Sequence, residues 1–339
     1  MIKPEAQLAF LAKIQRLFAE GDFTATYKFA LLIALADLAV ELGKDDAESL
    51  RLSHRSIGEK FIELYWQQAT PFKEGLLSQN HGGQAAVISD ILKFRRENPA
   101  ETLLTAKKLE SFKRLLTKIT RTVVVMPIEY LQNIGGSNEA FLYERQKDSI
   151  TLLPGVGFCL RRFQPLIQQL SRNGWIEHVK GNKRNLPLLG QSDDLESFLF
   201  ETPRQALTII GDSLRQLGNG KCFYCGGQIK EIDVDHFIPH SLYPRDLAHN
   251  FVAAHPTCNR SKSNTLASKE HLFNWMEFNE KHLDDLSEIG LRAGVQNDRA
   301  AVLSVARWGY LNALESHSYA WIKQKRYEPI HEEYLEIIA

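Results

Sequence analysis

Two short motifs late in the chain combine cysteine and histidine at the spacing of metal ligands. Cys222 and Cys225 form a Cys-x-x-Cys pair, and His255 and Cys258 follow about thirty residues later. Two pairs of soft donors at this spacing are typical of a four-coordinate structural zinc site, and no βαβ pattern surrounds the cysteines to favour a redox role. We therefore expect these four residues to bind Zn²⁺, with the nearby His249 as the alternative to His255.

Between and beside these pairs lie residues with hard donors and one imidazole, namely Asp235-His236, Asn250 and Asn259. Carboxylate and amide oxygens suit Mg²⁺ or Mn²⁺, and an imidazole can accept a proton near neutral pH. A hydrolytic reaction needs both an activated water and positive charge where negative charge develops. For His236 alone, an ordinary surface histidine is the better interpretation, but the full set favours catalysis.

The order of these residues resembles the HNH, or ββα-metal, nuclease family over residues 203–270. The stretch DVDHFIPHS, then Asn250 and NRSKSN, is similar to the HNH domain of RNA-guided CRISPR nucleases. The flanking cysteine pairs are similar to those of zinc-knuckle HNH proteins of bacteria and phages. The resemblance implies a first strand at residues 229–235, a loop at 237–249, a second strand at 251–254 and a helix starting near Pro256.

The resemblance also implies a role for each site residue. His236 would be the general base, while Asp235 and Asn259 would bind the hydrolytic Mg²⁺ or Mn²⁺. Asn250 would hold the loop that orients the histidine. Two departures from the family pattern are Asn259 in the place of the last histidine and His255 in the place of a cysteine. Two cations that follow Asn259 on the same expected helix are candidates for phosphate contact: Arg260 and Lys262.

The composition excludes several classes of protein. With 339 residues, 44% of them hydrophobic, the chain can build real cores, so a disordered chain is excluded. The 41 basic and 41 acidic residues give a net charge of zero, which argues against a protein that coats nucleic acid over its whole surface. The longest apolar stretch, residues 29–40, is too short to cross a bilayer, and the first residues do not read as a secretory signal. We expect a soluble, cytoplasmic protein without a membrane partner, and we expect Cys159 to be a buried apolar residue.

The expected fold is mainly α with small β elements. Residues 1–200 read as a large helical region for recognition or regulation, with a central apolar helix at 25–42 that ends at Gly43. A hairpin at 140–145 and 149–153, a helix from Phe163 and a short strand at 175–179 would suit a winged-helix-like part over 140–185. Residues 203–270 would form the HNH domain with its structural zinc. Residues 271–339 would form a helical C-terminal region, whose helices are expected at 268–286 and 298–326.

Two basic stretches, residues 107–121 and 161–184, could be solvated helix faces or phosphate-contacting surfaces. The late aromatic residues could stack on bases, but their helical spacing favours the core; they are Trp275, Trp308, Tyr310 and Trp321.

Together these observations favour a metal-dependent endonuclease that hydrolyses phosphodiester bonds in DNA, with RNA as the alternative substrate. One site with one hydrolytic ion would nick DNA as a monomer, and a homodimer or a partner protein would be needed for paired cuts. An HNH segment within an otherwise unfamiliar helical chain also resembles bacterial restriction and anti-phage nucleases. The competing hypothesis is a non-catalytic zinc module that binds nucleic acid or a protein partner.

Overall fold

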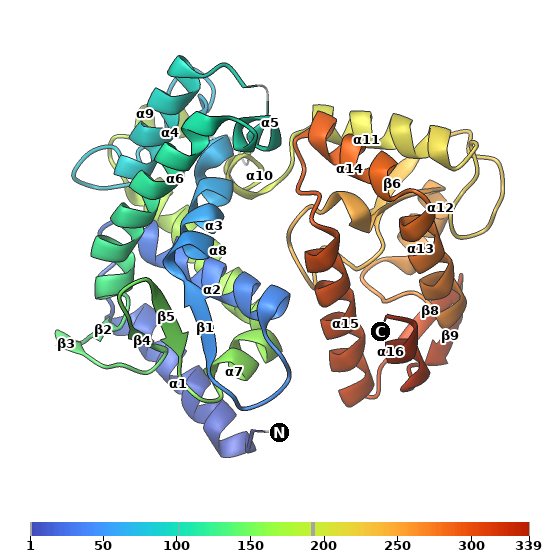
Figure 1. Ribbon diagram of the computed structural model, residues 1–339, viewed down its shortest axis with the longest axis horizontal. Coiled ribbons are helices and arrows are strands. Elements are labelled where there is room, and N and C mark those ends of the chain that lie inside the picture. Colours follow the sequence, from blue (N-terminus) through green and yellow to red (C-terminus); the bar gives the residue numbers. More distant parts are fainter. Residues whose placement is uncertain (1, 101, 191–193, 339) are drawn as a thin grey trace. The chain divides into compact units, whose positions relative to one another are not determined.

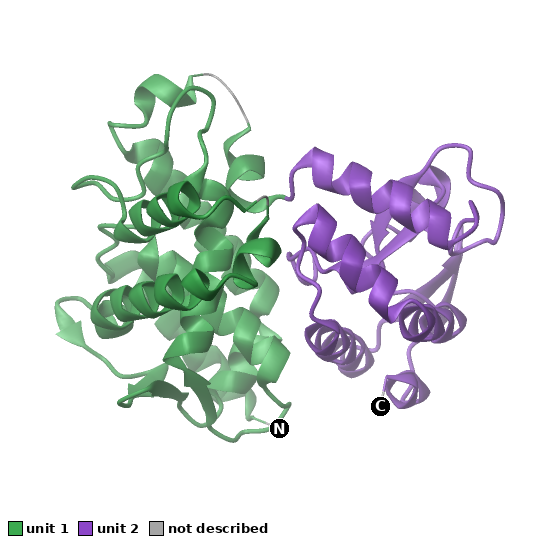
Figure 2. Ribbon diagram, turned by 45° about the horizontal axis from the view of Figure 1, so that its top comes forward, with its two compact units in different colours: residues 1–201 green, residues 202–339 purple. Residues whose placement is uncertain are grey.

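The computed structural model describes residues 2–100, 102–190 and 194–338. The chain folds into two compact units, Met1–Glu201 and Thr202–Ala339 (Figure 2). Both units are mainly helical and carry small antiparallel sheets, which confirms the expected fold class (Figure 1). Among the described residues, no helix combines the length and the apolar character needed to span a membrane.

The first unit is built around one buried helix, α2 (Tyr27–Leu42), which lies inside a layer of other helices. Fourteen of its sixteen residues are buried, because its Ala- and Leu-rich sequence is apolar on nearly every face. Its one buried acid, Asp37, accepts hydrogen bonds from the side-chain amides of Gln164 and Gln168. The surrounding helices are α1 (Pro4–Glu20), α3 (His54–Trp66), α4 (Ala86–Glu97), α5 (Leu103–Lys107), α6 (Glu110–Val123), α7 (Val156–Arg162), α8 (Gln164–Gly181), α9 (Leu186–Leu189) and α10 (Leu195–Phe200), with short helical turns at Gln67–Ala69 and Val124–Ile128.

The expected hairpin is present as part of a three-stranded antiparallel sheet. Strands β4 (Tyr143–Arg145) and β5 (Ser149–Leu152) pair with each other, and β1 (Leu50–Ser53) pairs with the other edge of β5. A separate two-stranded ribbon joins β2 (Asn133–Ile134) to β3 (Ser137–Asn138). These sheets are small, so helix packing provides most of the core of this unit.

The strand predicted at residues 175–179 is wrong, because this segment continues α8. The Asn173-Gly174 pair, which suggests a chain break in the sequence, lies inside the helix. A Cβ atom at Gly174 would lie 2.5 Å from a ring carbon of Phe29, so the glycine permits close packing against α2 rather than a turn. Trp175 and Val179 are then buried on the helical face. Without this strand, the winged-helix order does not form over residues 140–185.

The second unit places the ββα segment between flanking helices. The first strand, β6 (Asp233–His236), is shorter and later than predicted, whereas β7 (Phe251–Ala254) and α12 (Pro256–Lys262) form where expected. β6 pairs antiparallel with β7, so that Asp235 lies opposite Val252 and His236 opposite Phe251. The helices around them are α11 (Arg204–Leu217), α13 (Lys269–Lys281), α14 (Leu283–Ala293), α15 (Arg299–Glu315) and α16 (Glu333–Ile337), with a helical turn at Ala248–Asn250.

The long helix predicted for residues 298–326 ends early and gives way to a hairpin. α15 begins after Asp298, whose side chain accepts a hydrogen bond from the Ala301 amide, and it ends at Glu315. Strands β8 (Tyr319–Lys323) and β9 (Arg326–Pro329) follow. The aromatic residues expected in the core are buried there: Trp275, Trp308, Tyr310 and Trp321.

Candidate functional site

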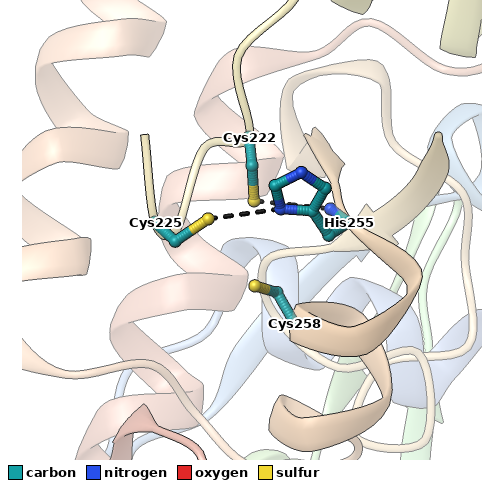
Figure 3. Close-up of side chains that lie close together, drawn as sticks. All are labelled: Cys222, Cys225, His255 and Cys258. Atoms are coloured by element: carbon teal, nitrogen blue, oxygen red, sulfur yellow. Dashed lines mark hydrogen bonds between the residues drawn. The ribbon is translucent and has the colours of Figure 1, made fainter. Parts of the chain in front are cut away.

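The four expected zinc ligands converge at one point in the second unit. One donor atom from each of Cys222, Cys225, His255 and Cys258 lies within 4.8 Å of every other (Figure 3). Cys225 Sγ and His255 Nδ1 are 3.2 Å apart. Three thiols and one imidazole in this arrangement are the donor set of a tetrahedral structural zinc site. The cluster therefore fits a structural zinc ion.

Local backbone geometry brings each pair of ligands together. In the first pair, Gly226 donates its N–H to the Cys222 carbonyl at 2.9 Å and has a φ of +68°, which folds Cys225 back toward Cys222. In the second pair, His255 caps α12 and Cys258 lies in its first turn. The His255 ring also contacts the Gln228 carbonyl through Nε2 at 3.0 Å, which leaves Nδ1 facing the sulfur atoms.

The thiols would repel one another as thiolates without a cation. Burial, and then the neighbouring cysteines, raise the pKa of the Cys258 thiol. His249, the alternative ligand, lies elsewhere: its ring is completely buried and contacts the side chains of Asn279 and Ser287. His255 is thus the histidine of the cluster.

Asp235 lies on β6 with its side chain almost completely buried between two donors. The Tyr224 hydroxyl donates a hydrogen bond of 2.5 Å to Oδ2, and the Lys262 ammonium lies 3.1 Å from the same oxygen. Burial, and then the Asp235 carboxylate, raise the pKa of Tyr224, so this phenol remains a donor. Tyr224 belongs to the loop between the two zinc cysteines, so the zinc cluster and Asp235 are directly linked.

Lys262, which the sequence predicts to be a phosphate contact, is buried inside the second unit. Its side chain has an exposed fraction of 0%, and its ammonium donates to the His236 carbonyl at 2.9 Å as well as to Asp235. A phosphate arriving from solvent does not reach such a group, so this placement corrects the expected phosphate contact. Burial lowers the pKa of Lys262, and the Asp235 carboxylate opposes this effect. Arg260, two residues earlier on α12, is exposed.

His236 is partly exposed at the end of β6 and has a carboxylate partner. Its Nε2 lies 2.5 Å from Oδ1 of Asp246, and its ring contacts Phe251 at a centroid distance of 4.7 Å. Burial by itself would raise the pKa of Asp246, but the hydrogen bond and charge of His236 lower it to about 2. Sequence reasoning missed Asp246, because its position in the loop carries no periodic signal.

The loop after His236 is closed by Asn250, which is buried. Its Oδ1 accepts the Ile238 N–H at 2.8 Å, and its Nδ2 donates to the Ile238 carbonyl at 2.9 Å. The Asn250 carbonyl also accepts the Phe237 N–H at 2.7 Å. The amide therefore pairs with both backbone groups of a residue two positions after His236 and restrains the loop there.

Asn259 projects from α12 toward β6. Its Nδ2 donates to Oδ2 of Asp233 at 3.2 Å. Side chains alternate along a strand, so Asp233 and Asp235 share one face of β6. Asn259 thus contacts Asp233, while Asp235 on the same face is held by Tyr224 and Lys262. Asp233 was also missed, although its spacing of two from Asp235 could have revealed it.

A second group of donors surrounds His236. The rings of His236 and His240 have centroids 5.0 Å apart, and one donor atom each from His236, His240 and Asp246 lie within 4.8 Å of one another. Two imidazoles and a carboxylate at this separation could also hold a transition-metal ion.

Several cations in the basic stretches of the first unit are paired with acids. Lys107 contacts Glu63, and Lys118 contacts Asp90. The Arg161 side chain is 5% exposed and binds Asp45. These ion pairs favour a structural role over phosphate contact for Lys107, Lys118 and Arg161.

Comparison with known proteins divides the chain in the same way as the fold. Residues 7–192 match the family described as "Domain of unknown function (DUF8808)", which covers more than half of the chain. The chain belongs to this DUF8808 family. Residues 222–268 of this DUF8808 protein match the family described as "HNH endonuclease". That segment contains both zinc-ligand pairs, β6, β7 and α12. No curated protein and no solved structure matches the chain.

Proposed function

We propose that the protein is a metal-dependent endonuclease that hydrolyses phosphodiester bonds in DNA. The observation that carries this proposal is the arrangement around His236. Its imidazole is partly exposed, is paired with Asp246, and extends from a strand whose loop is held by Asn250. A zinc module that only binds a partner needs the four soft ligands but none of these contacts.

The chain's own residues can carry the proton transfer. Asp246 accepts a hydrogen bond from Nε2–H of His236, so Nδ1 is the basic nitrogen. In the proposed step, Nδ1 takes a proton from a water whose oxygen attacks phosphorus. The bond from phosphorus to the leaving oxygen breaks, and that oxygen takes a proton from solvent.

The hydrolytic cation would be held by oxygens of Asp235 and Asn259, with Asp233 beside them. When bound, such an ion supplies positive charge to the phosphate on which negative charge develops. The buried ammonium of Lys262 adds fixed positive charge next to Asp235 and pins the carbonyl of His236. Lys262 is therefore proposed as a positioning residue, and Arg260 as a phosphate contact.

DNA as the substrate, nicking by the monomer and a restriction or anti-phage role are parts of this proposal. Nicking follows from the single His236 site, whereas DNA as the substrate and the defence role rest on the resemblance to bacterial HNH nucleases. We also propose a cytoplasmic location, because cysteines grouped with a histidine as metal ligands are typical of a reducing compartment.

The test is a time course on supercoiled plasmid with Mg²⁺ or Mn²⁺, using protein of known oligomeric state. Open-circular DNA should accumulate before linear DNA. His236→Ala should abolish cleavage while DNA binding and the circular-dichroism spectrum remain unchanged. Cleavage that survives in His236→Ala would exclude this residue as the base. Binding without cleavage under every metal condition would favour the non-catalytic zinc module.

A further inference from the structure

A groove lies between α12, which the HNH match covers, and the C-terminal β8–β9 hairpin, which it does not. The C-terminal β8–β9 hairpin packs next to this helix (Figure 1). The groove has a volume of about 620 Å³ and is lined by Thr257, Arg260, Ser261, Gln324, Lys325 and Tyr327. The three residues from α12 are spaced at i, i+3 and i+4, so they share one face of the helix.

The groove is positively charged, and its cations are not neutralised by the protein. Arg260 and Lys325 line it, no carboxylate does, and Lys323 and Arg326 are exposed on the same hairpin. In the part of the chain that the structure describes, none of these four cations has an ion-pair partner. The nearest acid in the sequence, Glu328, instead accepts hydrogen bonds from the Lys269 N–H and the Tyr334 hydroxyl.

The hairpin is fixed in place relative to the hydrolytic site. Trp321 of β8 donates from its ring nitrogen to Ser261 of α12 at 3.0 Å. Its backbone pairs with Leu266 and Ser268 at 2.8 Å each. The Trp321 ring meets Tyr224 edge-on at 5.2 Å, and Tyr224 donates to Asp235. A short series of contacts therefore connects the groove to the candidate metal ligands.

Two residues of the hairpin have features that suit a nucleic-acid strand. Tyr327 is 50% exposed, and it provides a flat aromatic face beside the two cations. Lys325 occupies the turn with a φ of +60°, a conformation for which Gly or Asn is usually preferred. Lys325 thus keeps a backbone conformation that is unfavourable for lysine while its ammonium faces solvent. Such conformations are common at functional sites.

We propose that this groove binds a single-stranded or locally unpaired DNA strand next to the hydrolytic site. Arg260 and Lys325 contact its phosphates, and Tyr327 stacks on one unpaired base. The inference rests on the proposed nuclease function and adds a substrate class to it. A duplex offers phosphates but no free base, so it would use only part of the groove.

The test measures binding of a single-stranded oligonucleotide and of the matching duplex to the full chain, by fluorescence anisotropy across a range of salt concentrations. A His236→Ala background prevents cleavage. Arg260→Gln keeps a helix-forming residue, and Lys325→Asn keeps a residue type that tolerates positive φ. Lys281→Gln is the matched control, because Lys281 is exposed on α13 and lies outside the groove.

Arg260→Gln and Lys325→Asn should each reduce the slope of log affinity against log salt by about 0.7 for the single strand, because one phosphate contact is lost. Tyr327→Ala should weaken single-strand binding about 10-fold with the slope unchanged, and it should affect duplex binding less. Tyr327→Phe should bind like the parent protein. If Tyr327→Ala does not fold, the two charge variants still decide the question.

Three results would overturn the inference. Slopes for Arg260→Gln and Lys325→Asn equal to that of Lys281→Gln would show that the groove makes no phosphate contact. If Tyr327→Ala weakens binding of the duplex and of the single strand equally, Tyr327 does not stack on an unpaired base. If the wild-type chain cleaves plasmid while the groove variants bind like the parent, this inference and the assignment of Arg260 as a phosphate contact fail, but the nuclease proposal stands. If the chain binds no DNA, the proposed function fails with it.

Discussion

The pairing of His236 with Asp246 makes the sharpest prediction, through the substitution Asp246→Asn. The change is nearly isosteric, so the loop keeps its shape, but the carboxylate that accepts from Nε2 of His236 at 2.5 Å is lost. An asparagine can donate to Nε2 instead, which would move the imidazole proton to Nδ1, the nitrogen proposed to act as the base. General-base catalysis contributes about 10²–10⁴-fold to the rate, so we expect kcat to decrease by a factor in that range.

The same substitution should change the response of stability to acid. The pKa of Asp246 is lowered from 3.8 to about 2 in the folded protein, which corresponds to about 2 kcal/mol of stability at neutral pH. A lowered folded pKa means that this stability is complete above pH 4 and is lost as the pH falls toward 2. The free energy of unfolding of the wild type should therefore exceed that of Asp246→Asn at neutral pH, and this difference should disappear between pH 4 and 2, as measured by urea unfolding.

The assay is single-turnover plasmid cleavage at saturating Mg²⁺, with Asp212→Asn as the matched control because Asp212 is exposed on α11. In a His236→Ala background, Asp246→Asn should not lower any residual cleavage rate further, since the two residues act as a unit. A rate for Asp246→Asn within about threefold of wild type would refute the proposed role of Asp246, because general-base catalysis is worth at least about 10²-fold.

Two further predictions concern the loop and the zinc cluster. Asn250→Ala should lower the free energy of unfolding by about 2–4 kcal/mol, because the N–H and C=O of Ile238 both lose a buried partner. Chemical denaturation checks this against Asn264→Ala, an exposed control, and an unchanged midpoint would contradict it. Elemental analysis should find one zinc per chain, and Cys222→Ser should lower both the zinc content and the thermal midpoint because binding is coupled to folding. Zinc-free protein with a wild-type thermal midpoint would show that zinc binding does not stabilise the fold.

The parts of this protein that the sequence predicts well are those set by local spacing. Two ligand pairs, each closed by a tight turn or by one turn of helix, are complete within a few residues, so only the distance between the pairs depends on the fold. The β7 strand and the start of α12 follow from the same segment. The central helix α2 is likewise predictable, because its sequence is apolar on nearly every face and can only be buried.

The direction of Lys262 was partly predictable. Residues two apart on a helix are about 200° apart around its axis, so Arg260 and Lys262 cannot both face solvent from the same side. What the sequence does not reveal is which of them faces β6. The docking of α12 against the strand decides this, and it directs Lys262 to Asp235.

Long-range contacts decided the remaining features. Asn173-Gly174 lies inside α8, and Phe29, far away in the chain, packs where a side chain at Gly174 would otherwise be. The β8–β9 hairpin replaces a predicted helix because Trp321 pairs with Leu266 and Ser268 outside its own segment. Asp246 contacts His236 because the loop between β6 and β7 brings it there. Local patterns record the preferences of neighbouring residues, whereas these partners are chosen by burial and hydrogen bonding between distant segments, which only the folded chain brings together.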